Sequence, residues 1–260
     1  MEVFSVSGIP EIEPGDDIAE LVAERVDLRG EETQDPPDVL VVASTIVSKA
    51  EGRLADLDEY PAGPRAREIA TRLGEISGDE KDPRFAQAVL EESTELVMEA
   101  PFLLTETKFG HVGVNAGIDR SNVPDHDLLL LPERPSESAA RIRERLPVDV
   151  PVVVTDTSGR PFRHGQSAVA IGWAGMFACR DWRDEPDRNG HELAVTVQCV
   201  VDELAAASNL VAGEGDGGTP VTVVRGWEFG DLDGHDKVFR SVDSDLVRQA
   251  LREWEFEDDR

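Results

Sequence analysis

The sequence of this 260-residue chain predicts a mixed α/β (α+β) fold. Apolar segments typical of strands alternate along the chain with segments that have the 3.6-residue period of helices. A chain of this length can bury roughly 75% of the surface that it exposes when unfolded, so it can form a core without covalent links. The two cysteines, Cys179 and Cys199, are too few for a disulfide framework and are interpreted as structural, with a single bridge left open.

The first half of the chain predicts strands and helices in alternation. Residues 15–26 predict a helix that Asp16 or Asp17 caps and that carries Ile18 and Val22 on its apolar face. A continuous apolar run at 38–43 is typical of a strand covered on both faces. The other elements expected here are a strand at 2–6, helices at 64–76 and 83–99, and a hairpin at 102–114.

The second half continues the alternation. The clearest helix is expected at 190–213, where apolar residues from Leu193 to Val211 recur at the helical period. The remaining expected elements are strands at 126–131, 150–156, 167–176 and 219–226, and helices at 136–146 and 243–256. No linker is long enough to separate independent domains, so residues 1–260 are expected to form one unit of two lobes, with candidate breaks near 77–84 and near 184–190.

The charge of the chain is strongly negative. It contains 54 acidic and 26 basic residues, with a formal net charge of −28, and only four of the basic residues are lysines. Phosphate backbones and anionic lipid would repel such a surface, so neither a nucleic acid nor a membrane is expected as a partner. Salt at 1 M shortens the Debye length to about 3 Å and would screen the self-repulsion. The composition therefore favours a protein from a salt-accumulating halophile over an acidic protein from an ordinary host.

The amino-terminal residues do not have the pattern of a signal peptide. The segment MEVFSVSGIPEIEPGDD has no basic region and no long apolar run. The longest apolar stretches, such as LLLLP, are far shorter than the ~20 residues that span a bilayer. We therefore expect a soluble cytoplasmic protein.

A first polar cluster follows the apolar strand at 38–43. Ser44 and Thr45 come directly after the strand, and Lys49 follows four residues later. Hydroxyl groups and a lysine after a buried strand are suited to phosphate oxygens. The glycines of a P-loop are missing, so this is not a Walker motif. The alternative is a surface lysine on an ordinary helix.

A second cluster contains Asp119 and Asn122 in the segment VNAGIDRSNV. Carboxylate and amide oxygens are hard ligands, which suit Mg²⁺ or Mn²⁺ and a nucleotide. The alternative is a turn in which the aspartate side chain binds its own backbone.

A third cluster occupies VVVTDTSGRPFRHGQ. Asp156 and Thr157 end an apolar strand, and Arg160, Arg163 and His164 follow in a loop rich in glycine and proline. An acid that holds a cation and arginines that bind oxygens in pairs are what a metal–phosphate site requires.

A fourth cluster follows the helix expected at 190–213. Glu214 and Asp216 lie among four glycines in VAGEGDGGTP, and glycine lets the backbone approach a ligand closely. A cation held by Glu214 is a better fit than a phosphate at this end of a helix. The alternative is a helix C-cap followed by a flexible loop.

Taken together, these segments resemble the coenzyme F(420)-0:γ-glutamyl ligases. The resemblance runs in order through GIPEIEPGDDIAEL, VVASTIVSKAEGR, AVLEES, NAGIDRSNV, TDTSGRPFRHGQ, AIGWAGM and VTVQCVVDELAAASNLVAGEGDGGTPVTVVRG, and it covers residues 8–226. It therefore includes all four clusters, which makes it more specific than any one of them.

The resemblance implies an activity and its partners. Members use GTP to join L-glutamate to coenzyme F(420)-0 through an amide bond and then add a second glutamate through its γ-carboxylate. They require Mg²⁺ or Mn²⁺ at two sites, are assisted by K⁺, and share a distinctive two-lobed fold that forms an intertwined homodimer. A GTP-dependent ligase for another acid and a non-catalytic GTP-binding module are the alternatives.

The resemblance also implies roles for individual residues. The segment Ile9, Pro10, Glu11 and Ile12 is expected at the guanine nucleotide, although the family varies at Glu11. Asp119 and Asp156 are expected to hold one metal, and Thr157 and Glu214 a second. Lys49 and Asp156 are expected to act in catalysis. Separately from the resemblance, Arg160 is also expected to act in catalysis, because Arg160 or Arg163 can anchor anionic groups of the substrate. The remaining expected nucleotide contacts are Ser44, Thr45, Lys49, Asn122 and the loop Leu210, Val211, Ala212, Gly213, Glu214, Gly215, Asp216 and Gly217.

Overall fold

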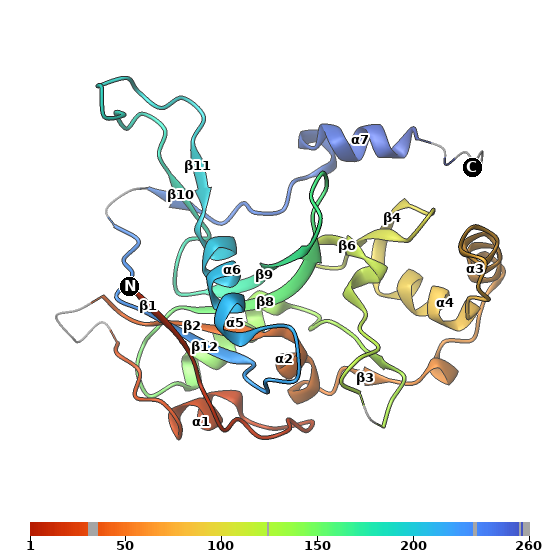
Figure 1. Cartoon of the computed structure of the whole chain (residues 1–260), viewed down its shortest axis with the longest axis horizontal. Helices are drawn as coiled ribbons and strands as arrows, with labels where there is room; N and C mark the ends of the chain where they lie inside the picture. The colour runs from red at the N-terminus through yellow and green to blue at the C-terminus, as the bar shows by residue number, and fades with distance from the viewer. Residues whose placement is uncertain (31–35, 124, 231–232, 255, 257–260) are drawn as a thin grey trace. The chain divides into compact units, whose positions relative to one another are not determined.

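The structure is a computed structural model that describes residues 1–30, 36–123, 125–230, 233–254 and 256. Among these residues it contains seven α-helices and several sheets, which confirms the mixed α/β class (Figure 1). The chain divides into two compact units, each built from two stretches. Unit 1 comprises Met1–Gly52 and Arg134–Val238, and unit 2 comprises Arg53–Glu133 and Phe239–Arg260. No helix in the described ranges is long and apolar enough to cross a membrane.

Unit 1 is organised around a five-stranded sheet in the order β1–β12–β2–β8–β9. Only the central pair, β2 and β8, is parallel, and the other pairs are antiparallel. The strands are β1 (Glu2–Ser5), β2 (Val39–Ala43), β8 (Val152–Gly159), β9 (Gln166–Ala174) and β12 (Val221–Arg225).

Helices cover both faces of this sheet, as the apolar run at 38–43 predicted. On one face Val39, Val41 and Val153 pack with Val201 and Leu204 of helix α6. The alternate side chains of the same strands are equally buried, because α2 and α5 pack on β8 and α1 packs on both of those helices. The helices are α1 (Ile18–Ala23), α2 (Ser44–Ala50), α5 (Pro135–Arg145) and α6 (Val200–Ala212).

Unit 1 also contains a small three-stranded sheet in the order β11–β10–β13. Two of its strands come before α6 in the sequence and the third comes after it. Its strands are β10 (Cys179–Asp181), β11 (Val197–Cys199) and β13 (Gly234–His235). The prediction of one helix over 190–213 was therefore wrong at its start, since residues 197–199 pair with β10 and the helix begins at Val200. The apolar residues before Val200 alternate as in a strand, but some of them also match the helical period. The prediction therefore joined the strand and the helix into one element.

The described residues of unit 2 form two small sheets and three α-helices. Its core joins α3 and α4, with Ile69 of α3 and Val89 of α4 both buried. The segment near 77–84, where a break was predicted, links α3 to α4, and the lobe boundaries stay a prediction. The elements are β3 (Leu54–Ala55), α3 (Pro64–Ser77), α4 (Pro83–Glu91), β4 (Ser93–Met98), β5 (Leu104–Thr107), β6 (Val112–Val114), β7 (Leu128–Leu129), α7 (Leu246–Arg252) and the 3₁₀ turns Leu57–Glu59, Asn115–Gly117 and Val242–Ser244.

The helix predicted at 83–99 is also shorter than expected. Helix α4 ends at Glu91, and β4 begins at Ser93 and pairs with β5. The hairpin predicted at 102–114 is confirmed as β5 and β6.

Helix α7 closes unit 2 through a buried arginine. The Arg248 side chain is 3% exposed, and its guanidinium donates to Glu106 in two hydrogen bonds of 2.7 and 3.1 Å and also to Glu95. The Arg248 contact lowers the pKa of Glu106 below its ordinary value. The last helix is thus attached to β4 and β5 by paired charges.

Candidate functional site

The parallel pairing of β2 and β8 brings the first and third polar clusters together. Ala43 lies opposite Thr155 at the ends of the two strands, so the next residues, Ser44 and Asp156, are neighbours. The buried Ser44 hydroxyl donates to Asp156 Oδ1 at 3.0 Å. Thr45 follows in the first turn of α2 and is half-buried. The register of one strand pair therefore produces this contact between residues that are far apart in the sequence.

The next residue of β8 contacts the fourth cluster. Thr157 Oγ1 donates to both carboxylate oxygens of Glu214, at 3.0 and 3.2 Å, and Asn209 Nδ2 donates to Oε1 of the same carboxylate at 2.7 Å. Helix α6 ends at Ala212, and Gly213 turns the chain with a φ of +73°. The predicted segment 210–217 therefore combines the last turn of α6, including the largely exposed Leu210, with an exposed loop.

The two oxygen pairs lie on opposite faces of β8. Successive side chains of a strand point to opposite sides, and here Asp156 meets the start of α2 while Thr157 meets the residues after α6. Each pair offers a carboxylate and a hydroxyl, which are hard donors of the kind that Mg²⁺ and Mn²⁺ prefer. Within the described residues no three His, Cys, Asp or Glu side chains form a metal-binding group. A cation at either pair would complete its coordination with phosphate oxygens and water, which is usual for Mg²⁺.

Lys49 lies at the end of α2 and is buried. Its side chain is 7% exposed and forms an ion pair with Glu11, whose own side chain is 73% exposed. The segment that contains Glu11 passes this end of α2, where Gly15 N–H donates to Ala50 O at 2.8 Å and Ile12 is buried. The structure thus brings the predicted guanine segment to the predicted phosphate lysine, and Lys49 is not the surface lysine of the alternative interpretation.

Asp119 and Asn122 lie in unit 2. The Asp119 carboxylate accepts hydrogen bonds from Ser121 N–H and Oγ, each at 2.8 Å, which is the turn considered as the alternative. Asn122 is exposed and has a φ of +57°. The metal site expected from Asp119 and Asp156 stays a prediction.

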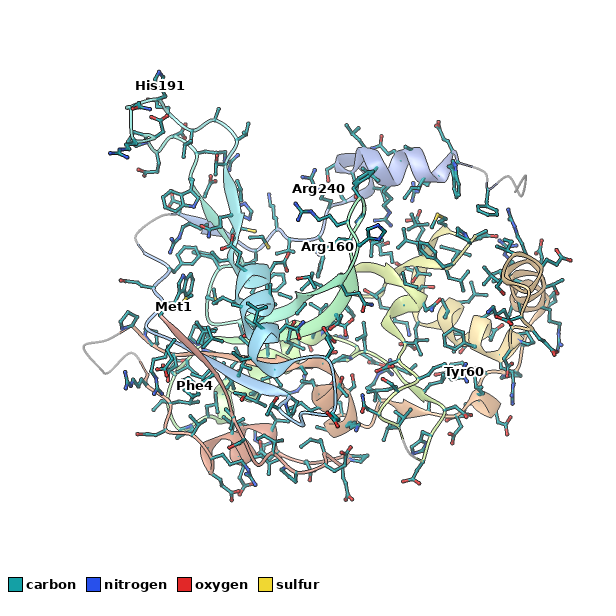
Figure 2. The ribbon with its side chains drawn as sticks, in the orientation of Figure 1. Met1, Phe4, Tyr60, Arg160, His191 and Arg240 are labelled. Atoms are coloured by element: carbon teal, nitrogen blue, oxygen red, sulfur yellow. The ribbon has the colours of Figure 1, made fainter. Side chains whose placement is uncertain are left out.

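Arg160, Arg163 and His164 occupy the turn between β8 and β9, and all three are exposed. Figure 2 shows Arg160 where the chain leaves β8 for this turn. The pairing of β8 with β9 has a bulge between Val154 and Thr155, directly before Asp156. Bulges often re-aim side chains next to functional sites.

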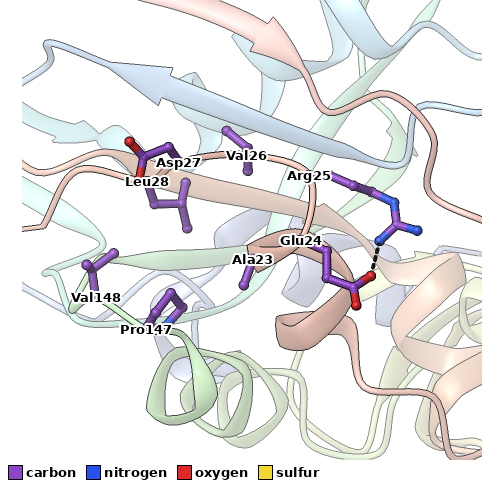
Figure 3. A pocket seen from close by; sticks show the side chains of 8 residues that line it. All are labelled: Ala23, Glu24, Arg25, Val26, Asp27, Leu28, Pro147 and Val148. Carbon is purple, nitrogen blue, oxygen red and sulfur yellow. Dashed lines mark hydrogen bonds and ion pairs between the residues drawn. The ribbon is translucent and has the colours of Figure 1, made fainter.

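Unit 1 also has a hollow of about 430 Å³ that contains none of the predicted site residues (Figure 3). Arg25 in its wall donates to Gly8 O at 2.7 Å and to Glu24 at 3.1 Å, and therefore fixes the start of the segment that includes Glu11. The hollow is lined by Ala23, Glu24, Arg25, Val26, Asp27, Leu28, Pro147 and Val148. It lacks the paired oxygens found at the end of β8, so we do not assign it as the functional site.

Sequence reasoning missed two residues that support the site. Asn209 lies five residues before Glu214, and its place on the last turn of a helix was the available signal. The contact of Arg25 with Gly8 has no local sequence signal, because it depends on how a loop crosses α1.

Comparisons with known proteins agree with these observations. The family model described as "F420-0:Gamma-glutamyl ligase" matches residues 8–226. A Coenzyme F420:L-glutamate ligase of Halorubrum lacusprofundi is 70% identical over 258 residues, which cover 99% of this chain and 100% of the relative. The protein of the same name from Halobacterium salinarum is 67% identical over 99% of both chains. That of Archaeoglobus fulgidus is 46% identical over 97% of this chain and 98% of the relative.

The first two relatives come from halophilic archaea, which fits the prediction made from the acidic composition. The match covers the oxygen pairs at the end of β8 and the Lys49–Glu11 pair. The chain is a ligase and belongs to the F420-0:γ-glutamyl ligase family.

Proposed function

We propose that the protein uses GTP to join L-glutamate to coenzyme F(420)-0 and releases GDP and phosphate. The observation that carries this proposal is the pair of carboxylate–hydroxyl contacts, Ser44 with Asp156 and Thr157 with Glu214, at the end of the central strands. They offer hard oxygen ligands on two sides of one strand. Lys49 supplies a positive charge on the helix that follows β2.

The chemistry requires an activated carboxylate, because a carboxylate does not condense with an amine at neutral pH. The γ-phosphoryl group of GTP passes to the coenzyme's carboxylate oxygen, and GDP leaves. The glutamate amine then attacks the acyl carbon, phosphate departs with the carbon–oxygen bond electrons, and the amine loses a proton. Phosphoryl transfer of this kind depends mainly on positioning and charge neutralisation. A second, γ-linked glutamate would be added by the same sequence.

The chain's own residues would perform the positioning. Asp156, with Asp119, would hold one divalent cation, and Thr157, with Glu214, would hold another. When bound, Mg²⁺ or Mn²⁺ neutralises charge on the phosphate oxygens. Lys49 would exchange its contact with Glu11 for one with a phosphate, so that the ammonium stays paired in both states.

The remaining properties of the proposal concern the nucleotide and the assembly. Ser44, Thr45, Asn122, residues 9–12 and the loop 210–217 would contact GTP. We also propose that K⁺ assists the reaction, that two chains form an intertwined homodimer of two-lobed subunits, and that the protein works in the cytoplasm. Soluble, highly acidic chains are suited to a cytoplasm rich in salt.

The direct test is a reaction of the protein with F(420)-0, L-glutamate, GTP and Mn²⁺, followed by mass spectrometry. One or two added glutamate residues together with GDP support the proposal. GDP formed only with another acid would instead indicate a ligase for that acid, and GTP binding without GDP formation would indicate a binding module.

A variant pair assigns the site. Asp156→Asn should abolish the GDP release that depends on both coenzyme and metal, with an unchanged circular dichroism spectrum. Asp149→Asn is the matched control, because Asp149 is exposed and precedes the opposite end of β8. Wild-type turnover by Asp156→Asn would refute the metal assignment.

A further inference from the structure

The turn between β8 and β9, residues 160–165, has an unusual apolar residue at its centre. All six residues of the turn are exposed, and Phe162 is 97% exposed. A phenylalanine at this position buries no surface in the fold, so it adds nothing to the core. Its presence calls for a reason other than packing within the chain.

The backbone conformation of Phe162 is a second, independent sign that core packing does not explain this residue. Its φ is +64°, in the left-handed region that a bulky side chain rarely occupies. Pro161 and Phe162 form the turn, and a proline followed by a residue of positive φ is the pattern in which glycine or asparagine is favoured. Phenylalanine is thus held here against the local backbone preference.

Two arginines flank Phe162 in the turn. A four-residue turn brings the Cα atoms of its first and fourth residues within about 7 Å, so the backbones of Arg160 and Arg163 lie close together at the two ends of the turn. Neither forms an ion pair or hydrogen bond with any residue that the structure describes. In a chain of net charge −28, most other arginines have a nearby carboxylate to bind. The turn therefore presents free cations beside an exposed aromatic ring.

We propose that residues 160–163 form the binding site for the acidic acceptor of the ligase reaction. Arg160 and Arg163 bind its anionic groups, and Phe162 packs on its flat aromatic part. The proposal rests on the proposed function, because that function supplies an acceptor which is both anionic and aromatic. Arginine binds phosphate and carboxylate oxygens in pairs, and aromatic rings stack on planar ligands.

The position of the turn agrees with this role. Arg160 follows Asp156 by four residues on the same strand and turn, which corresponds to about 13 Å at the rise of a β-strand. The turn would therefore hold the acceptor at a distance from the phosphates, while its carboxylate reaches the end of β8. Strand β8 and the turn that follows it would thus carry both metal ligands and the contacts to the acceptor.

The experiment measures acceptor binding separately from turnover. Titration of F(420)-0 fluorescence against the protein, without GTP or glutamate, should give a Kd about tenfold higher for Arg163→Gln, as expected when a charge-assisted hydrogen bond is lost. The KM values for GTP and glutamate should stay within about twofold of the wild type, because the variant leaves the nucleotide residues unchanged. Arg188→Gln is the matched control, since Arg188 is an exposed arginine in the loop between β10 and β11 with no partner among the described residues.

Phe162→Gly distinguishes a ligand contact from a structural role. Glycine accepts a positive φ, so this variant should melt at a higher temperature than the wild type and yet bind F(420)-0 more weakly. An unchanged F(420)-0 Kd in both Arg163→Gln and Phe162→Gly would overturn the proposal. Failure of the wild type to add glutamate would instead overturn the proposed function, so the two failures are distinguishable.

Discussion

Replacement of Lys49 by arginine tests the assignment of the phosphate lysine. The change keeps the positive charge but substitutes a planar guanidinium for a compact ammonium. Because the Lys49 side chain is only 7% exposed, the larger group has little room at the end of α2. We therefore expect Lys49→Arg to displace the charge from its position beside the nucleotide.

The magnitude follows from the contacts involved. A hydrogen bond between a charged donor and an anion contributes about 1.5–3 kcal/mol, and overpacking of a buried site costs about 1–3 kcal/mol. Loss of the phosphate contact alone corresponds to a decrease in kcat/KM for GTP of about 10- to 150-fold. The overpacking cost should appear separately, as a lower melting temperature.

The assay is steady-state GDP release with saturating F(420)-0 and glutamate in molar KCl. Lys108→Arg is the matched control, because Lys108 is half-exposed and pairs with Glu92 in unit 2. Glu11→Gln adds a second measurement: it should lower the melting temperature of the free protein, and GTP should restore it by replacing the lost counter-ion. A Lys49→Arg variant with wild-type kcat/KM would refute the reasoning.

Four further outcomes follow from the structure. Asp38 is fully buried and accepts two hydrogen bonds from Arg225, so Asp38→Asn should lower the free energy of unfolding by about 3–5 kcal/mol in denaturant titrations. Gly172→Ala should destabilise unit 1, because a Cβ there would lie 2.3 Å from the backbone of α5; a wild-type melting temperature would contradict this close contact. Since the hydrogen bond from Arg248 lowers the pKa of Glu106 in the folded state, the pair stabilises the fold above the ordinary pKa of 4.5 and its contribution is lost as the pH falls through the lowered pKa; the stability difference between the wild type and Arg248→Met should therefore shrink as the pH falls below 4.5. Finally, activity and compactness should rise with molar KCl, and full activity in dilute buffer would contradict the halophilic interpretation.

Much of unit 1 could be predicted because its strands are strongly apolar. The run at Val39–Ala43 and the run that opens β8 both indicated strands with polar residues at their ends. Sequence alone could not supply the register that places Ala43 opposite Thr155, because 112 residues separate Ser44 from Asp156. The clusters were therefore visible, while the contacts between them were not.

Errors occurred where a helix and a strand adjoin without a turn signal. Glu92 alone separates α4 from β4, and its neighbours satisfy a helical and an alternating pattern equally well. The pairing of β4 with β5 decides the outcome, and this depends on tertiary contacts. The ion pair of Lys49 with Glu11 was hidden for a similar reason, since it depends on the course of a loop past α2.

The buried Arg248 has a consequence for the order in which the protein folds during synthesis. Its partners Glu95 and Glu106 are made 153 and 142 residues earlier, and every strand of the five-stranded sheet emerges before it does. Until then, the two carboxylates lack the guanidinium that neutralises them, and β4 lacks the helix that covers it. Domains generally fold as their residues emerge from the ribosome. Unit 2, although most of it is translated before the second stretch of unit 1, is therefore expected to be the last part of the molecule to reach its native state.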